Sequence, residues 1–348
     1  MSYETPGHSH HRRTIPFAAR DGMACNLVHI TGERPPTKEP VLLVHGAGVR
    51  ADIFMAPVRT TLVDLLVEAG YDVWLENWRA SIDFPPNRWT LDQAALFDHP
   101  AAVEKVVEET GASSIKAVVH CQGSTSFVMS AVAGLVPQVK TIVSNAVSLH
   151  PVVPPAARVK QVAVSVLSRL TEYVNPQWGL APPTALARAL TAYVRLTHHE
   201  CDNIVCRWAS FTYGVGFPTL WRHENLNEET HRWLVKEFAA VPLSFFEQMK
   251  ECIHAGHLVA FDHATELPDD FVADAPLTDA RFALFAGEAN RCFTPESQLR
   301  THRWLEQFRP GYHSVHVVPG YGHLDIFMGK DAGRDVLPLM IAELNRPN

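Results

Sequence analysis

Hydrophobic positions along the chain form short continuous runs that alternate with longer amphipathic segments. The run Pro40–Val44 is wholly apolar and is followed by His45 and Gly46. Similar runs occupy residues 71–75, 115–120 and 141–147. Such runs are typical of strands buried on both faces of a parallel sheet. Helical periodicity lies between them, at residues 51–69 and 91–110, and a glycine follows each segment. Strands that alternate with helices of this length predict an α/β fold.

The alternation stops over residues 150–256, where the pattern is helical and rich in proline and tryptophan. It resumes with predicted strands at 281–286 and 314–318 and predicted helices at 296–308 and 334–344. A helical insertion between two strands predicts a cap over the carboxyl edge of the sheet, where ligands of open α/β sheets bind. We therefore divide the chain into a first core part (1–149), a cap (150–256) and a second core part (257–348).

Composition excludes several classes of protein. The chain has 348 residues, 47% of them hydrophobic and 19% charged, so it is not expected to be disordered. Its net charge of −7 and the lack of a basic stripe argue against a nucleic-acid partner. No apolar run reaches the length of a membrane span, and the polar N-terminus does not resemble a secretory signal. The six scattered cysteines are expected to be reduced in a cytoplasmic protein, and the histidines at 8–11 to form a solvated tail.

The stretch from Ala117 to Ser124 carries the most chemical information. A predicted buried strand ends at His120, Cys121 stands at the turn, and a predicted helix begins at Gly123. This is the form of the G-x-S-x-G nucleophile elbow, with cysteine in place of serine. The alternative is that Cys121 is only a buried packing residue.

Two further segments favour the catalytic interpretation. The loop after the first buried strand contains Ala47, whose N–H together with that of Gln122 is expected to form an oxyanion hole. The glycine-rich loop after the last strand contains His323, the candidate base. The order of nucleophile, acid and histidine along the chain fits this interpretation. Asp325 is expected to cap the helix that follows.

The third catalytic residue is expected just after the strand at 281–286. Asn290 is the first candidate, because an amide oxygen can orient an imidazole by accepting its N–H and Cys-His-Asn sites exist. We also expect the Cys121 thiol to ionise against an imidazolium. Glu288 is the second candidate for the third residue, and Asp262 is a more remote one.

Taken together, these stretches resemble the α/β-hydrolase superfamily over essentially the whole chain. The resemblance is greatest to the acid-lipase branch and to hydrolase domains fused to cholesterol-oxidase-like (GMC) flavoproteins. It rests on residues 42–46, 71–79, 120–124, 238–249, 260–262, 287–295 and 320–325. It implies a mostly parallel eight-stranded sheet with flanking helices, a helical lid and ester-bond chemistry, and it makes Arg79 a structural ion-pair residue.

The resulting hypothesis is a cysteine-dependent acyl hydrolase that forms an acyl-Cys121 intermediate. Alternatives are an acyltransferase or C–C bond hydrolase on the same scaffold, or a catalytically silent fold that binds a ligand. The substrate is expected to be a small hydrophobic ester, lactone or thioester, since the cap is aromatic. For most of these rings, however, the favoured interpretation is that they form the cap's own core. The aromatic cap residues are Trp178, Tyr193, Trp208, Phe211, Tyr213, Phe217 and Trp221.

No cofactor is expected, and the oligomeric state stays open, with a homodimer as one option. Cys201 and Cys206, with His198 and His199 just upstream, suggest a metal. Their spacing matches no standard zinc pattern, however, so no metal is expected either.

Overall fold

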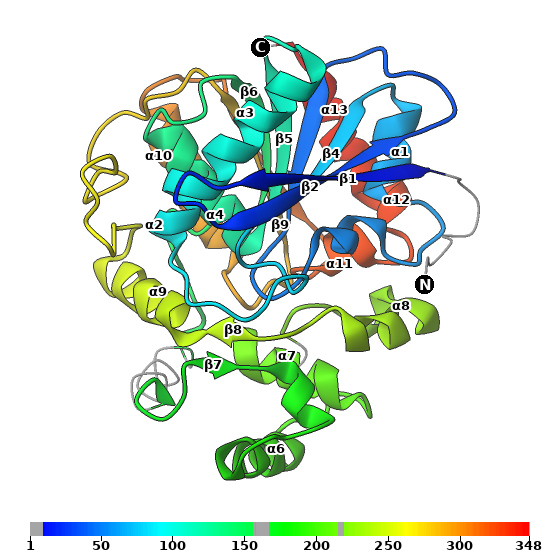
Figure 1. The fold of residues 1–348 in the computed structure, drawn as a ribbon, viewed down its shortest axis with the longest axis vertical. Coiled ribbons are helices and arrows are strands. Elements are labelled where there is room, and N and C mark those ends of the chain that lie inside the picture. The colour runs from blue at the N-terminus through cyan, green and yellow to red at the C-terminus, as the bar shows by residue number, and fades with distance from the viewer. Residues whose placement is uncertain (1–9, 156, 158–166, 215–218, 348) are drawn as a thin grey trace.

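The computed structural model describes residues 10–155, 157, 167–214 and 219–347. Eight strands form its central sheet: β1 (His11–Ala18), β2 (Ala24–Thr31), β3 (Pro40–Val44), β4 (Asp72–Asn77), β5 (Ile115–His120), β6 (Val139–Asn145), β9 (Arg281–Gly287) and β10 (Ser314–Val318). The strand order is β1-β2-β4-β3-β5-β6-β9-β10 (Figure 1). Strands β4, β3, β5, β6, β9 and β10 pair in parallel, and β1 and β2 extend the sheet with antiparallel pairing. The predicted mostly parallel sheet is confirmed.

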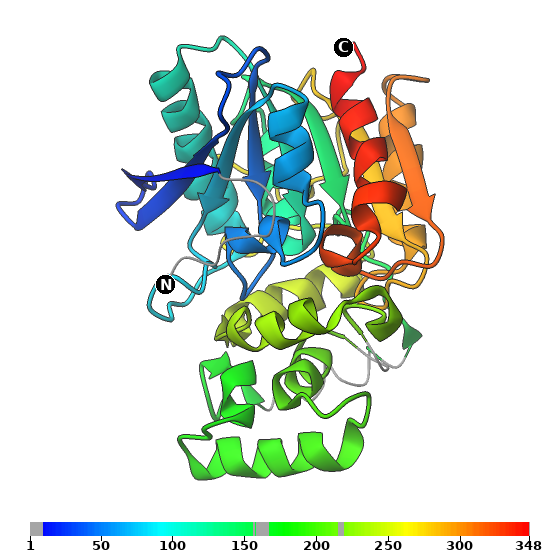
Figure 2. The ribbon, with the colours of Figure 1, turned by 90° about the vertical axis from the view of Figure 1, so that its right-hand side faces the viewer.

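Helices cover both faces of the sheet (Figures 1 and 2). They are α1 (Leu62–Glu68), α2 (Leu91–Gln93), α3 (His99–Thr110), α4 (Cys121–Val132), α10 (Pro295–Glu306), α11 (Asp325–Met328), α12 (Ala332–Asp335) and α13 (Leu337–Asn345). Helices α1 and α13 pack together on one face, and α3 packs against α4 on the other. The core strand β3 has all five residues buried, as expected for a strand covered on both sides.

The chain between β6 and β9 leaves the sheet, and its helices fold below the sheet in both views (Figures 1 and 2). Its described helices and strands are β7 (Tyr173–Val174), η3 (Pro176–Gly179), α6 (Ala185–Thr197), α7 (Ile204–Tyr213), η4 (His223–Asn225), α8 (Glu228–Trp233), η5 (Leu234–Lys236), β8 (Val241–Pro242) and α9 (Leu243–Ala255). Strands β7 and β8 pair with each other rather than with the main sheet. We call the described residues of this segment, 167–214 and 219–256, the cap.

Several sequence expectations need correction at the N-terminal side. The hairpin β1–β2 was not predicted, because β1 is an edge strand in which only Ile15 is buried. His10 is not part of a solvated tail, since its Nε2 lies 2.7 Å from Asp64 Oδ1, and His11 begins β1; residues 8 and 9 lie outside the described residues. The predicted helix at 51–69 is two pieces, η1 (Ala51–Met55) and α1, with Pro57 between them.

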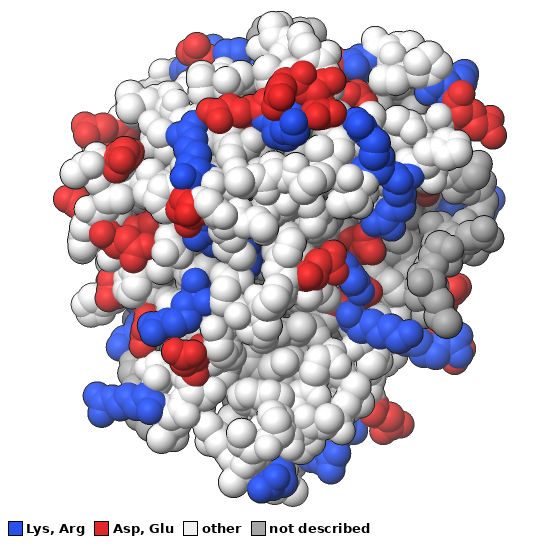
Figure 3. Space-filling model, viewed as in Figure 1, with Lys and Arg blue, Asp and Glu red and all other residues white. Residues whose placement is uncertain are grey.

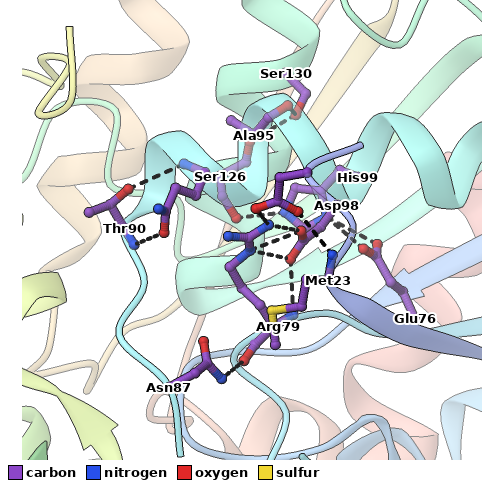
Figure 4. Close-up of polar contacts among 12 residues, drawn as sticks. Met23, Glu76, Arg79, Asn87, Thr90, Ala95, Asp98, His99, Ser126 and Ser130 are labelled. Carbon is purple, nitrogen blue, oxygen red and sulfur yellow. Dashed lines mark hydrogen bonds and ion pairs between the residues drawn. The ribbon is translucent and has the colours of Figure 1, made fainter. Parts of the chain in front are cut away.

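The predicted helix at 91–110 is continuous, but it contains a π-helical turn, η2 (Ala94–Asp98). This turn places Asp98 in a buried polar network near α4 (Figure 4). Arg79 donates to both carboxylate oxygens of Asp98, at 2.6–2.9 Å, and to Asp21 at 2.8 Å. Only 3% of the Arg79 surface is exposed, so Arg79 is the structural ion-pair residue that the resemblance implied.

A second buried contact links the same region directly to α4. The Nδ1 of His99 lies 2.9 Å from Glu76 of β4, and its Nε2 lies 2.7 Å from Ser126 of α4 (Figure 4). All three side chains are fully buried. Buried polar groups stabilise a fold only when they are hydrogen-bonded, and here each finds a partner. The network therefore fixes α4 against the sheet.

On the molecular face drawn in Figure 3, acidic and basic side chains are interspersed between uncharged regions. None of the helices in the described residues combines the length and the apolar character needed to cross a bilayer.

Replacement of Arg79 by methionine is expected to lower the free energy of unfolding by about 3–5 kcal/mol, because Asp98 would remain buried without its cation. Urea denaturation followed by circular dichroism measures this change. The matched control is Arg12→Met, which removes the solvent-exposed pair with Asp52 and should cost less than about 1 kcal/mol. Equal losses in both variants would contradict the structural role given to Arg79.

Candidate active site

Loops from four parallel strands meet at the carboxyl edge of the sheet. Cys121 follows β5, the loop with Ala47 follows β3, Asn290 follows β9, and His323 follows β10. The cap covers this edge: the hydroxyl of Tyr213 donates to the backbone oxygen of Ala47 at 3.0 Å. The structure thus brings the four segments selected from the sequence into one place.

The turn that carries Cys121 is sharp and closely packed. Cys121 has a φ of 56°, in the left-handed region that side-chain-bearing residues rarely occupy. Two glycines allow the neighbouring chains to approach. A Cβ on Gly123 would lie 2.0 Å from the backbone oxygen of His45, and a Cβ on Gly46 would lie 2.9 Å from the Cβ of Cys121. A strained turn of this kind is the geometry of a nucleophile elbow.

Cys121 lies at the floor of a cavity and is partly exposed. Burial raises the pKa of its thiol to about 12, although the backbone N–H groups of Gln122 and Ala47 bond to the sulfur and act in the opposite direction. The two amides predicted to form the oxyanion hole therefore converge beside Cys121. Burial therefore favours the neutral thiol over the thiolate of the expected thiolate–imidazolium pair.

The ring of His323 is close to Cys121 and almost completely buried, with 1% of its surface exposed. The sulfur of Cys121 and one ring nitrogen each of His323 and His120 all lie within 4.8 Å of one another. Burial lowers the pKa of His323 to about 3, so its resting form is a neutral imidazole. Its Nε2 has no hydrogen-bond partner among the described residues. His323 lines a small pocket together with Ala47 and Cys121.

Asn290, rather than Glu288, contacts His323. The Nδ2 of Asn290 lies 3.0 Å from Nδ1 of His323, and only 3% of the Asn290 surface is exposed. Glu288 is exposed, and its carboxylate accepts from the N–H of Gly320 at 3.3 Å. Of the two candidates left open by the sequence, the structure places only Asn290 against the ring.

The orientation of the Asn290 amide is the reverse of the expected one. Its Oδ1 accepts from the N–H of Cys292 at 3.0 Å, which leaves its NH₂ group facing His323. Nδ1 of His323 must then accept a hydrogen bond, so the proton of the neutral ring resides on Nε2. In Ser-His-Asp triads the proton resides on Nδ1 and Nε2 acts as the base. The resting tautomer here is therefore the one that cannot take a proton from Cys121.

The His323 loop is held from both sides. Below the ring, Asn145 donates to Nδ1 of His120 at 2.9 Å and to the backbone oxygen of His323 at 3.2 Å. From the cap, the backbone oxygen of Leu220 accepts from the N–H of His323 at 3.1 Å. The side chain of Asn225 donates to Asp325 at 2.6 Å. The position of the His323 ring therefore depends on cap residues.

Asp325 does not cap the following helix as expected, because it makes no side-chain capping bond there. Instead its Oδ1 accepts from the N–H of Gly322 at 2.8 Å, which closes the loop around His323.

The remaining candidates lie elsewhere. Asp262 bonds to Thr90 and makes no contact with His323 in the described chain. Ser124, the serine nearest to the elbow, is fully buried with its hydroxyl 2.6 Å from that of Ser144, so it cannot replace Cys121 as a nucleophile.

The cavity above Cys121 has a volume of about 110 Å³ and is mainly apolar. Its walls come from the elbow, from α7 and α9 of the cap, and from the loop after β9. They include Tyr213, Leu220, Phe245, Met249, Cys292 and Phe293. Of the cap aromatics named from the sequence, Tyr213 lines the cavity, whereas the ring of Trp208 packs against those of Trp178 and Phe211. Phe217 lies outside the described residues.

Comparisons with known proteins agree with this architecture. Residues 39–330 match the family described as alpha/beta hydrolase fold, and the chain therefore belongs to that family. It is similar to sterol esterase 2 of Saccharomyces cerevisiae, with 30% identity over 131 residues, 33% of this chain and 24% of the esterase. It is also similar to human lipase member K, with 24% identity over 328 residues, 87% of this chain and 78% of the lipase.

Among solved structures, the monoacylglycerol lipase of Paleococcus ferrophilus superposes with a TM-score of 0.54 at 15% identity, over 96% of this chain and 99% of that chain. At this identity the likeness concerns the fold alone.

Because burial raises the pKa of the Cys121 thiol, we expect the rate of its alkylation to depend on pH. The rate of iodoacetamide labelling at Cys121 should rise about tenfold per pH unit from about pH 6 to about pH 10, because only the scarce thiolate reacts. Peptide mass spectrometry quantifies the site, and Cys121→Ala provides the background. A labelling rate that is already at a plateau near neutral pH would show a preformed thiolate instead.

Proposed function

We propose that this protein is an ester hydrolase that uses Cys121 as its nucleophile and acts on hydrophobic esters, lactones or thioesters. The observation that carries the proposal is the position of Cys121, held at a φ of 56° between the N–H groups of Ala47 and Gln122 and beside His323. The names of the related lipases and sterol esterase support ester chemistry. The aligned part covers only about a quarter of the sterol esterase, so the substrate class rests on the site itself.

The mechanism begins with both groups neutral. As Cys121 Sγ attacks the acyl carbon, its proton passes to Nε2 of His323, and the carbonyl oxygen gains a negative charge that the N–H groups of Ala47 and Gln122 stabilise. The carbon–oxygen bond of the ester then breaks, and the leaving alkoxide takes the proton from His323. Water, deprotonated by the same nitrogen, hydrolyses the acyl-Cys121 thioester and regenerates the thiol.

This sequence requires the other tautomer of His323. Rotation of the Asn290 amide by half a turn would place Oδ1 against the ring and allow Nδ1 to carry the proton. The rotation gives up the hydrogen bond from the N–H of Cys292. Loss of such a buried bond costs about 1–3 kcal/mol, which corresponds to a rate reduction of about 5-fold to 150-fold. We therefore expect a slow enzyme rather than an inactive one.

The apolar cavity supports a hydrophobic acyl group, and its small volume favours a short one. We expect the protein to work in a reducing compartment such as the cytoplasm, because the mechanism needs a free thiol. All six cysteines belong to the described residues, and none of them forms a disulfide.

A second candidate function is a ligand-binding protein without catalytic activity. The observation that favours it is the Asn290 amide group, which donates to His323 and thereby disables the base. The two candidate functions differ in whether the wild type hydrolyses esters and whether that hydrolysis requires Cys121.

Cys121→Ala is expected to reduce kcat for p-nitrophenyl butyrate at least about 1,000-fold, because no other group can form the acyl intermediate. Steady-state kinetics over a series of acyl chain lengths measures the effect. The control is Cys252→Ser, a buried cysteine of α9 outside the cavity lining. Turnover that survives in Cys121→Ala, or the absence of turnover for every ester in the wild type, would contradict the proposal.

Asn290→Asp is expected to raise kcat at least about tenfold, since a carboxylate accepts both from Nδ1–H of His323 and from the N–H of Cys292 without rotation. The carboxylate also raises the pKa of His323, so the acidic limb of the pH–rate profile should move upward. The exposed Glu288→Gln serves as the control and should change kcat less than about twofold. An unchanged or lower kcat in Asn290→Asp would contradict the tautomer argument.

A further inference from the structure

Four potential metal ligands meet in the cap. Cys201 and Cys206 flank the start of α7, His223 begins η4, and His231 lies in α8. One ligand atom from each of these side chains lies within 4.8 Å of all the others. Cys206 is buried, and the other three are partly buried. The cluster is separate from the catalytic residues and has no part in the proposed mechanism.

The distances within the cluster fit a tetrahedral metal site. Sγ of Cys201 lies 3.6 Å from Nε2 of His231, and Sγ of Cys206 lies 3.3 Å from Nε2 of His223. With zinc–sulfur bonds of about 2.3 Å and zinc–nitrogen bonds of about 2.0–2.1 Å, tetrahedral geometry places sulfur and nitrogen about 3.6 Å apart. Both histidines direct the same ring nitrogen, Nε2, toward a sulfur. Only small movements are needed to enclose one ion.

The donor set selects the kind of metal. Two thiolates and two imidazoles are the ligands of structural zinc sites and are poor ligands for magnesium or calcium, which prefer oxygen. Four protein ligands leave no open coordination position for a substrate, which indicates a structural rather than a catalytic ion. The spacing in the sequence matches no zinc pattern when His198 and His199 are counted with the cysteines. Taken as a pair, Cys201 and Cys206 have a spacing found in zinc sites, although the seven residues between His223 and His231 exceed the usual number.

Supporting contacts hold the ligands in place. Asn203, the N-cap of α7, accepts from the backbone N–H groups of Val205 and Cys206. The Nδ2 of the same side chain donates to the backbone oxygen of His231 at 3.1 Å. One residue therefore fixes the position of both a cysteine and a histidine of the cluster, as outer residues of metal sites commonly do.

We propose that Cys201, Cys206, His223 and His231 bind one structural zinc ion that fastens the start of α7 to η4 and α8. His198 and His199, the histidines suggested by the sequence, are not part of it: they contact Thr197 and the backbone oxygen of Leu196. Zinc stabilises small units that cannot bury a large core of their own, and the cap is such a unit.

The position of the zinc site connects it to the catalytic site. Helix α7 ends at Tyr213, which contacts the Ala47 loop. The segment that contains His223 also contains Asn225, which holds Asp325 beside the His323 loop. Zinc thus fastens the two cap segments that reach the site, and its removal should loosen both.

The first test is the metal content of the purified full-length chain, measured by inductively coupled plasma mass spectrometry after dialysis. The wild type is expected to hold about one zinc ion per chain. Cys206→Ser and His231→Asn should each lose at least about 90% of it. The matched controls, Cys252→Ser in α9 and the exposed His263→Asn, should retain the wild-type amount.

A second measurement on the wild type keeps the proposal testable if the variants fail to fold. After removal of zinc by a chelator, added cobalt(II) should give the visible bands of a tetrahedral ion and the near-ultraviolet absorption of thiolate ligation. Bound metal should also protect Cys201 and Cys206 from alkylation.

Three results would overturn the proposal. The first is a wild type that holds less than about 0.1 zinc ion per chain and gives no cobalt spectrum. The second is stoichiometric zinc that persists in Cys206→Ser and His231→Asn, and the third is a Cys201–Cys206 disulfide in protein prepared without reductant. The last result would define a redox pair in place of a metal site.

Discussion

The tight turn between β5 and α4 is the constraint on which the candidate site depends. The left-handed backbone of Cys121 is tolerated because α4 begins at once and because Gly46 and Gly123 let the loop after β3 lie against the turn. This close approach is what brings the N–H of Ala47 next to the N–H of Gln122 at the sulfur. Any side chain at position 123 would collide with the backbone of His45 and separate the N–H groups of Ala47 and Gln122. Backbone strain at one residue and an oxyanion site are therefore parts of the same packing arrangement.

This site differs from a serine triad because its buried residues, including the one beside His323, are uncharged. In a triad with aspartate, the carboxylate stabilises the imidazolium that forms during attack. Here the residue beside His323 is neutral and donates a hydrogen bond, and the low polarity of the surroundings lowers the pKa of His323 while it raises that of Cys121. A thiol loses its proton more easily than a serine hydroxyl, so cysteine is the nucleophile that tolerates a weak base. The pairing of Cys121 with Asn290 is chemically consistent.

The sequence predicted the parts of the fold that are buried runs of apolar residues. Strands β3, β4, β5, β6 and β9 could be identified because nearly all of their residues are buried. Strand β10 is an edge strand in which only Val318 is buried, and its valines identified it. The site residues could be selected because each follows a predicted strand. Strand β1, also an edge strand with one buried residue, begins with four polar residues and escaped detection.

Other features depend on contacts that no local pattern contains. The orientation of the Asn290 amide is set by the backbone N–H of Cys292, and a sequence carries no signal for that choice. The cluster in the cap was missed for a similar reason: sixteen residues separate Cys206 from His223, and only the packing of α7 against the next cap segments brings them together. The sequence suggested His198 and His199 as ligands instead, but these side chains contact Thr197 and the backbone oxygen of Leu196.

The proposed mechanism requires that Cys121 carries the acyl group during turnover. Rapid mixing of the wild type with an activated butyrate ester, acid quenching and peptide mass spectrometry test it most directly. We expect a butyryl thioester on the peptide that contains Cys121, with a rate of decay that matches kcat. Turnover without this adduct, or with an adduct on another residue, would contradict the claim.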